Sequence, residues 1–428
     1  MGATPDLPAD PHDGTEPELV RRSGVVLRVG RLSLSAGTGS YRVKASMARV
    51  ARALGIERHQ AHVTLTEITT TSHRGASFRT EVTEVRSVGI DADRLRALER
   101  LGQDVERRRS VTVEEVDREL DRIQSTPPLY PTVVNALWAA LACAAFAFLN
   151  DGGPVEVVVV FLAAGLGQLL RRILLHRGLN QFGVTMLAAA LASLAYVAFL
   201  AALDAVGATT TNHEAGYVSA VLFLVPGFPL VTGALDLAKL DFSAGIARLT
   251  YALMILTSAA LSVWAVSTVV GLAPVPADPV ALDEGVRLGL RLVASLLGVL
   301  GFALMFNSPW GMALAAASIG MVANTGRLWL VDAGVPAQAA AAGAALVVGL
   351  LAALVAPRMN VPRITVSVPA VVIMVPGAAA YRAIYYVSNG DTTQALAYAV
   401  DAGLVVAALA IGLAVARMLT DRAWSFER

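Results

Sequence analysis

The chain has 428 residues, of which 55% are hydrophobic and 16% are charged, and its mean hydropathy is +0.60. A soluble domain of this size would carry about 25% charged residues, so the composition argues against an ordinary soluble enzyme. The charged residues are concentrated at one end, with 39 in residues 1–130 and 28 in the rest of the chain. Neither part has the excess of positive charge that is typical of nucleic-acid-binding proteins.

Residues 1–23 form an acidic tail that we expect to be disordered, because the first 20 contain five acidic residues, four prolines and no basic residue. Residues 24–126 are predicted to form a small cytoplasmic α+β domain. Apolar spacing predicts helices over 40–54 and 94–105 and strands over 63–66 and 77–85. Thr112 and Glu115 form a capping box that predicts one more helix.

Three histidines of this domain, His59, His62 and His73, raise the alternative of a membrane-anchored hydrolase. The sequence His59-Gln-Ala-His62 departs from the His-Glu-x-x-His zinc motif and lies where a helix is expected to give way to a strand. We therefore predict no metal site, no cofactor and no catalytic residue. The sequence also contains no P-loop, so transport would use an ion gradient or run downhill, as in a passive channel.

Residues 131–420 divide into about ten apolar runs, each long enough for a helix that crosses a bilayer. Breaks rich in Pro, Gly, Asn and Asp separate them. With both termini inside, ten Lys and Arg residues fall on the inner side and four on the outer side. This asymmetry predicts a multi-pass protein of the cell membrane with cytoplasmic termini, ending in a tail over 421–428. The expected spans are 133–149, 154–170, 183–203, 217–235, 247–270, 288–306, 308–325, 336–356, 364–386 and 395–417.

An internal repeat relates the two halves of this apolar region. Residues 218–227 and 368–377 are identical at six of ten positions at an offset of 150, and both end in Val-Pro-Gly. Because five spans separate the copies, they face opposite ways across the membrane. We therefore predict two inverted five-helix repeats, at 131–270 and 283–420, an organisation typical of secondary transporters that bind substrate between the repeats.

The two Val-Pro-Gly segments fall near the middle of their spans. Pro226 and Pro376 remove a helical hydrogen bond, and Gly227 and Gly377 let the backbone leave helical geometry. A broken helix exposes a half-helix N-terminus that attracts carboxylates. These four residues are predicted to bind substrate, with ordinary proline kinks as the alternative interpretation.

Polar residues within the spans are the remaining candidates. Asp401 is predicted to carry the coupling proton, and its copy in the first half is Tyr251. Arg382 is predicted to pair with a substrate carboxylate or with Asp401; a position at the membrane interface is the alternative for both residues. The cavity lining is predicted to include three further polar residues: Thr232, Asp236 and Asn324.

The chain resembles the threonine/serine exporter (ThrE-type) family. The residues that carry this resemblance are Ser35 to Val43, Val225-Pro-Gly-Phe-Pro229 with Asp236 and Asp241 to Gly245, Pro362-Arg363, and Val375-Pro-Gly377. It covers about residues 24–420 and implies a cytoplasmic N-terminal domain, ten helices and export of threonine and serine by the proton-motive force. Some relatives divide the two modules over separate chains and have been linked to dicarboxylate export.

These observations predict a transporter rather than an enzyme. The expected function is export of threonine or serine, small-molecule substrates, coupled to protons and driven by alternating access around the broken helices. The expected surroundings are the lipid bilayer, without nucleic acid, and a homo-oligomer is compatible with the sequence. A dicarboxylate exporter of the succinate type is the alternative, since Arg291, Arg382 and two helix breaks suit either substrate.

Overall fold

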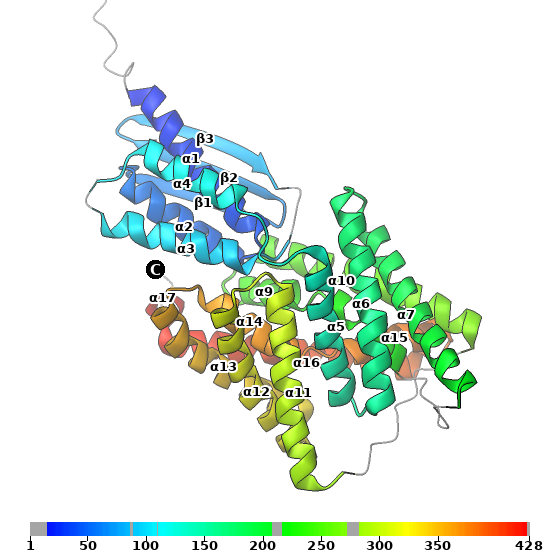
Figure 1. Cartoon of the computed structure of the whole chain (residues 1–428). Coiled ribbons are helices and arrows are strands. Elements are labelled where there is room, and N and C mark those ends of the chain that lie inside the picture. The colour runs from blue at the N-terminus through cyan, green and yellow to red at the C-terminus, as the bar shows by residue number, and fades with distance from the viewer. Residues whose placement is uncertain (1–14, 86–88, 109, 208–215, 272–281, 426–428) are drawn as a thin grey trace, which may run out of the picture. The chain divides into compact units, whose positions relative to one another are not determined.

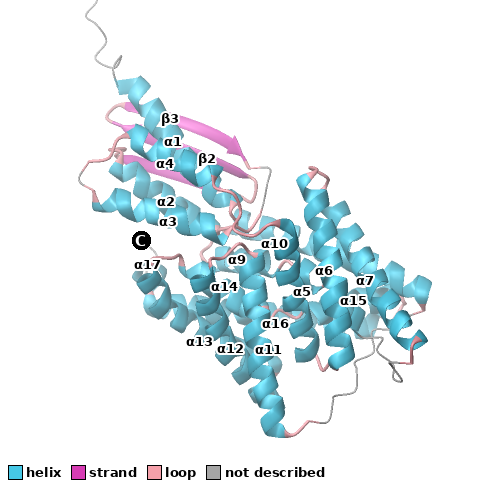
Figure 2. Cartoon of the chain, in the orientation of Figure 1, coloured by secondary structure: helices cyan, strands magenta, loops and turns pink. Residues whose placement is uncertain are grey.

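The computed structural model describes residues 15–85, 89–108, 110–207, 216–271 and 282–425 (Figure 1). The chain forms two compact units, residues up to 127 without 91–93, and residues 91–93 with 128–428. Figure 2 shows the strands in the first unit, and the described elements from residue 132 onward are all helical. The predicted class, a helical membrane protein preceded by a small α+β domain, is confirmed.

The N-terminal unit is built on a three-stranded antiparallel sheet with the order β1-β2-β3. Helices α1 and α2 pack on the sheet, where Met47 of α2 and Ile68 of β2 are fully buried. The elements are α1 (Thr15–Ser35), α2 (Ser40–Ala53), β1 (Arg58–Val63), β2 (Glu67–Arg74), β3 (Ser77–Glu84), α3 (Ala92–Arg107) and α4 (Val113–Ser125).

Most of the elements predicted for this unit are confirmed, including the capping box between Thr112 and Glu115 that opens α4. The strand predicted over 63–66 is wrong, because β1 ends at Val63. The amide of Glu67 donates to Thr64 Oγ1 at 3.1 Å, so residues 64–66 turn the chain instead. Threonine hydroxyls often make such local bonds, which compete with strand pairing.

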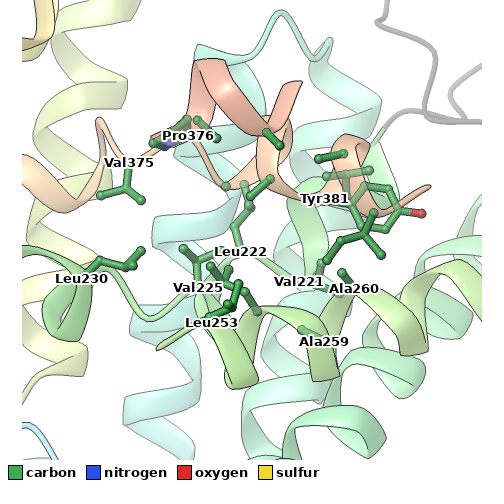
Figure 3. Close-up of a pocket in the computed structure, with 18 of the residues that line it drawn as sticks. Val221, Leu222, Val225, Leu230, Leu253, Ala259, Ala260, Val375, Pro376 and Tyr381 are labelled. Atoms are coloured by element: carbon green, nitrogen blue, oxygen red, sulfur yellow. The ribbon is translucent and has the colours of Figure 1, made fainter. Parts of the chain in front are cut away.

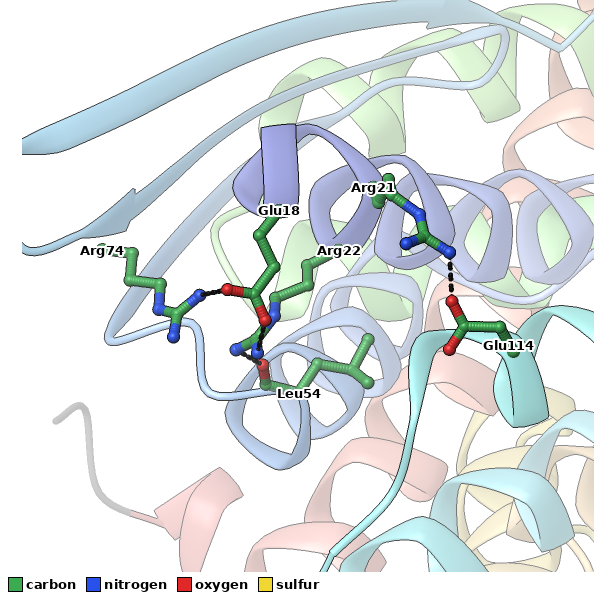
Figure 4. A network of polar contacts seen from close by, with 6 residues as sticks. All are labelled: Glu18, Arg21, Arg22, Leu54, Arg74 and Glu114. Carbon is green, nitrogen blue, oxygen red and sulfur yellow. Dashed lines mark hydrogen bonds and ion pairs between the residues drawn. The ribbon is translucent and has the colours of Figure 1, made fainter. Parts of the chain in front are cut away.

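The acidic tail expected over residues 1–23 is also partly wrong, because α1 begins at Thr15; residues 1–14 lie outside the described part. Leu19 in the first turns of α1 is 1% exposed. The Glu18 carboxylate accepts a hydrogen bond from Arg74, at 2.5 Å, and one from Arg22, which also donates to the Leu54 carbonyl (Figure 4). This first part of α1 is hard to predict from the sequence, because the charged residues and prolines around Leu19 hide its apolar pattern.

Acidification is expected to loosen the start of α1. The hydrogen bond from Arg74 lowers the pKa of Glu18 below its ordinary value. A carboxyl with a lowered pKa in the folded state stabilises the fold above its unfolded pKa, and this stability is lost as the pH falls through the folded pKa. Glu18→Gln should therefore speed hydrogen exchange of the α1 amides at pH 7, and this effect should shrink as the pH falls and the carboxyl group of the wild type becomes protonated. An acceleration that does not change with pH would show that packing, not the charge, explains the effect.

The three histidines named above are not grouped as metal ligands in the described part of the chain. His59 and His62 are three residues apart on β1, so they point to opposite faces of the sheet. His59 Nδ1 lies 3.0 Å from Ser72 Oγ. Among the described residues, no three His, Cys, Asp or Glu side chains are grouped closely enough to hold a metal ion.

Among the residues of the second unit that the structure describes, eight helices are long and apolar enough to cross a membrane, or ten if each of two bent helix pairs is one span. These ten segments correspond one by one to the ten expected spans. The helices are α5 (Thr132–Leu149), α6 (Pro154–His176), α7 (Gln181–Ala205), α8 (Gly216–Ala220), η1 (Leu222–Leu224), α9 (Gly227–Ala238), α10 (Phe242–Val270), α11 (Glu284–Met305), α12 (Trp310–Asp332), α13 (Ala337–Met359), α14 (Arg363–Val372), α15 (Gly377–Ser388), α16 (Thr392–Thr420) and α17 (Arg422–Ser425).

Several helices of the two halves of this unit match in length and in spacing along the chain. Helices α6 and α12 both have 23 residues and start 156 positions apart. Helices α9 and α15 have 12 residues each, α10 and α16 have 29 each, and both pairs start 150 positions apart. Helix α10 packs on α15, and α16 packs on α9, so the halves exchange equivalent contacts. Residues related by these offsets are called counterparts below.

Candidate functional site

The two Val-Pro-Gly segments break their helices in the same way. The helix axes bend by 58° between η1 and α9 and by 52° between α14 and α15. Pro226 and Pro376 have nearly identical backbone angles, with φ −80° in both and ψ of 56° and 61°. In both segments the glycine amide donates to the valine carbonyl two residues earlier, at 2.8 Å. The predicted interruptions are therefore present, and a new helix begins at each glycine.

The N-terminus of α15 carries more free donors than that of α9. The amides of Ala378 and Ala379 have no backbone acceptor among the described residues, as is usual in the first turn of a helix. In α9 the counterpart of Ala379 is Pro229, which has no amide hydrogen. The second break is therefore the better anion site, because free amides and the helix dipole act together there.

A cavity of about 450 Å³ opens beside this second break, and we call it the polar cavity. Its wall includes the backbone from Pro376 to Ala379. Helices α12, α13, α15 and α16 and the residue after α5 contribute the polar side chains, and apolar residues complete the lining. The polar lining residues are Asn150, Arg327, Gln338, Arg382 and Asp401.

Arg327 is held in place by a chain of hydrogen bonds. Its Nε donates to Asn324 Oδ1 at 3.0 Å, and Asn324 Nδ2 donates to Ser295 Oγ at 2.9 Å. Asn324 and Ser295 are fully buried. Asn324 does not line the polar cavity, so its amide positions Arg327, whose terminal amino groups remain available to a ligand.

Arg382 lies over an aromatic ring instead of beside a carboxylate. Its guanidinium carbon is 5.8 Å from the centre of the Tyr398 ring, within the range of a cation–π interaction. The Tyr398 ring stacks on Tyr386 at 5.6 Å and 8°. Arg382 Nε is buried without a hydrogen-bond partner among the described residues. This arginine is therefore fixed in direction and free to bind an anion.

Asp401 is the acidic residue that lines this cavity. Its Oδ1 accepts a hydrogen bond from Gln338 Nε2 at 3.4 Å, which is long for such a bond. No ion pair joins Asp401 to Arg382 within the described parts of the chain, so the pairing considered from the sequence is absent. The carboxyl group remains open to a proton or to a cationic ligand group.

The remaining predicted residues lie elsewhere. Asp236 and Arg248 form a buried ion pair at 3.0 Å, and the Thr232 hydroxyl donates to the Phe228 carbonyl at 2.9 Å. Pro226 and Gly227 belong to the first break and do not line the polar cavity. The structure therefore brings together Pro376, Gly377, Arg382 and Asp401, and separates them from Pro226, Gly227, Thr232, Asp236 and Asn324.

Several residues of the polar cavity have aromatic counterparts. Asp401 and Gln338 correspond to Tyr251 and Phe182, whose ring centres are 6.3 Å apart. Asn150 and Ala378 correspond to Phe306 and Phe228, whose rings are 5.8 Å apart. Arg327, by contrast, corresponds to another arginine, Arg171, which donates to Gln168 Oε1 at 3.4 Å, so the two halves differ at Asp401, Gln338, Asn150 and Ala378 and not at this arginine.

The ion pair of the first half is also replaced in the second. The counterparts of Asp236 and Arg248 are Tyr386 and Tyr398, the stacked pair that lies under Arg382. A charge pair thus joins α9 to α10, whereas stacked rings join α15 to α16. This exchange places an aromatic platform beside the polar cavity.

Sequence reasoning missed Arg327, Gln338 and Asn150. The seventh span was expected to end at residue 325, which left Arg327 in a loop, but α12 continues to Asp332. Arg327 could have been found in the sequence, because the apolar pattern of the span continues past it to residue 331. Gln338 and Asn150 lie next to helix ends, where polar residues are ordinary, so the sequence alone does not distinguish them.

The fold and the site together define a class of protein: a polytopic membrane protein whose broken helix borders a charged cavity, as in membrane transporters. Residues 24–270 match the family model described as "Putative threonine/serine exporter", and residues 291–419 match "Threonine/Serine exporter, ThrE". The chain belongs to the threonine/serine exporter family.

The relatives include proteins named as threonine/serine exporters and proteins named as succinate transporter subunits. The "Threonine/serine exporter" of Corynebacterium glutamicum is 26% identical over 98% of this chain and 87% of its own length. The "Probable threonine/serine exporter" of Mycobacterium tuberculosis is 25% identical over 93% of this chain and 76% of its own. The "Probable succinate transporter subunit YjjP" of Escherichia coli is 27% identical over 56% of this chain and 93% of its own. No solved structure matches the chain.

Proposed function

We propose that this protein exports threonine and serine by secondary active transport driven by the proton-motive force, and that the polar cavity binds the substrate. The observation that carries the proposal is the convergence of two arginines and a helix N-terminus with one carboxyl group around a single cavity. A free amino acid needs positively charged or donor groups to bind its carboxylate and a negatively charged group to bind its ammonium.

The arrangement suggests how such a substrate is held. The substrate carboxylate binds Arg327, Arg382 and the amides that open α15, because all of these attract negative charge. The ammonium group binds Asp401. Gln338 and Asn150 supply the amide groups that a side-chain hydroxyl can bond. Names of the full-length relatives support the amino-acid substrate.

Proton coupling is assigned to Asp401. A carboxyl group placed well inside a membrane span is costly to keep charged unless it is paired or hydrated. Asp401 has one long hydrogen bond and no cationic partner among the described residues, so uptake of a proton removes this cost. Protonation also removes the negative charge that holds the ammonium group, which couples proton entry to substrate release.

Alternating access is assigned to the two repeats. If each bent pair is one span, each half has five spans, and an odd number makes the halves inverted copies. In inverted repeats, two conformations arise when the halves exchange their local arrangements. The two breaks differ in this structure, because a cavity lies beside the second and the Phe228 and Phe306 rings contact each other beside the first; such a difference is expected for one of these two states.

The dicarboxylate alternative rests on a specific feature, the two arginines of the polar cavity. If Asp401 is protonated, the two positive charges of Arg327 and Arg382 balance the two negative charges of a dicarboxylate. The succinate transporter subunits match 56% of the chain and support this alternative by their names alone. Counterflow in proteoliposomes decides between the substrates. Labelled threonine and serine should accumulate against unlabelled threonine, and succinate should not; accumulation of succinate alone would reverse the assignment.

The topology that this mechanism needs is testable directly. With ten spans and cytoplasmic termini, residue 241 lies inside and residue 391 outside. Single cysteines there, in a Cys143→Ala background, should react with an impermeant maleimide from opposite sides of the membrane. Reaction of both from one side would rule out inverted repeats, and with them the exchange of conformations proposed above.

Loss of the bond between Asn324 and Arg327 should weaken substrate binding. Hydrogen bonds to charged groups contribute about 1.5–3 kcal/mol, so Asn324→Ala should raise KM about tenfold or more while the maximal rate changes little. Asn324→Asp keeps an acceptor for Arg327 Nε and should restore most of the affinity. A fall in maximal rate at unchanged KM in both variants would assign Asn324 to conformational change rather than to positioning.

A further inference from the structure

A second cavity, of about 340 Å³, lies on the other side of the second helix break, and we call it the apolar cavity. Both cavities share Val375, Pro376 and Gly377 as a common wall. Figure 3 shows side chains from η1, α10 and α15 that point into the apolar cavity, among them Leu222, Leu253 and Tyr381. Its surface is hydrocarbon almost throughout.

The cavity has a buried end and an exposed mouth. Leu222, Val263 and Tyr381 at its inner end are at most 5% exposed. At the mouth, Leu253 of α10 is 61% exposed, and Ala399 and Gly403 of α16 are also exposed. Both α10 and α16 are candidate membrane spans, so the mouth opens toward the hydrocarbon of the bilayer.

The volume of the cavity arises from a difference between the two halves. Val225 and Val375 are counterparts, and both line it, so the cavity lies where the halves meet. Leu253 on α10 corresponds to Gly403 on α16, and Leu249 corresponds to Ala399. A Cβ atom added at Gly403 would meet no atom within 4 Å. Small residues on α16 therefore leave space that leucines would fill.

Two kinds of occupant are excluded by the physical properties of this space, and an empty cavity is unfavourable. A substrate with full charges would lose its hydration without gaining partners, since the Tyr381 hydroxyl already lies 3.3 Å from that of Tyr217. A helix from another protein, about 10 Å across, is too wide for this volume. An empty apolar space forfeits dispersion contacts along its whole lining.

We propose that the apolar cavity binds one acyl chain of a bilayer phospholipid, which enters between α10 and α16. The methylene groups of the acyl chain fill the cavity and make the dispersion contacts with its lining that an empty space would lack. Since Val375 to Gly377 form the back wall, the bound chain supports the helix break from behind. The site itself does not depend on the identity of the transported substrate.

The test uses the full chain in nanodiscs that contain phosphatidylglycerol with a photoreactive diazirine near the end of one acyl chain. After illumination, mass spectrometry locates the adducts. Adducts at the inner residues Leu222 and Val263 are expected in the wild type, together with adducts at Leu261, which is 41% exposed and reports surface lipid. Gly403→Leu should lower the inner adducts severalfold relative to those at Leu261.

Gly343→Leu is the matched control. Gly343 is an exposed glycine of α13 where an added Cβ also meets no atom within 4 Å, so this variant should leave both kinds of adduct unchanged. Inner adducts that persist in Gly403→Leu, or adducts confined to Leu261 in the wild type, would overturn the proposal. Because transport is not the readout, this result is independent of the proposed function.

Discussion

Asp401→Asn is expected to abolish proton-driven net export while leaving exchange of substrate against substrate intact. Asparagine resembles the protonated carboxyl group and cannot release a proton. Exchange needs no net proton movement, so labelled threonine should still enter proteoliposomes loaded with unlabelled threonine. Net export driven by an imposed pH gradient should fall to the level of liposomes without protein.

Asp391→Asn is the control for this variant. Asp391 precedes the same helix and caps it by accepting a hydrogen bond from the Gln394 amide at 3.0 Å. Asparagine caps helices as well as aspartate does, so coupled export should persist. Loss of exchange as well as export in Asp401→Asn would assign Asp401 to substrate binding alone. Normal pH-dependent export would remove Asp401 from the mechanism.

Gly377→Leu is expected to eliminate transport while leaving the protein in the membrane. A Cβ atom at this position would lie 2.7 Å from a Leu222 methyl group and 2.9 Å from a Val225 methyl group. Forcing a side chain into such a contact costs about 1–3 kcal/mol and would displace the wall between the two cavities. Initial rates of threonine counterflow and the amount of folded protein should be measured together.

Gly227, the counterpart of Gly377, provides the comparison for this variant. A Cβ atom at Gly227 would lie 3.2 Å from Val372, which is the counterpart of Leu222. The contact is therefore equivalent to that of Gly377 with Leu222, but it is looser. Gly227→Leu should therefore reduce transport less severely than Gly377→Leu. Equal and normal rates in both variants would show that the breaks are rigid kinks and that transport does not require movement there.

The membrane architecture could be predicted from the sequence because it depends on local properties. Apolar runs of sufficient length must be helical in a bilayer, where every backbone group needs an internal partner. The Val-Pro-Gly breaks were equally accessible, since proline removes a donor wherever it stands. The repeat made both breaks visible at once, because Pro226 and Pro376 occupy equivalent positions.

The composition of the candidate site could be predicted only in part. Asp401 and Arg382 stand out as charges inside apolar runs, but their separation without an ion pair depends on how α15 packs against α16. Asp236 looks equally functional in the sequence, yet it forms an ion pair with Arg248 twelve residues later. Such pairings depend on tertiary contacts, which cannot be predicted from the positions of the residues along the chain.

The measurement that tests the central claim most directly is protection of a cysteine in the polar cavity by substrate. In a Cys143→Ala background, Ala379→Cys lies in the wall of that cavity and Asn389→Cys lies after the same helix. Threonine should slow reaction of Ala379→Cys with a water-soluble maleimide and leave Asn389→Cys unaffected. Equal rates at Ala379→Cys with and without threonine, serine or succinate would contradict the assignment of the polar cavity as the substrate site.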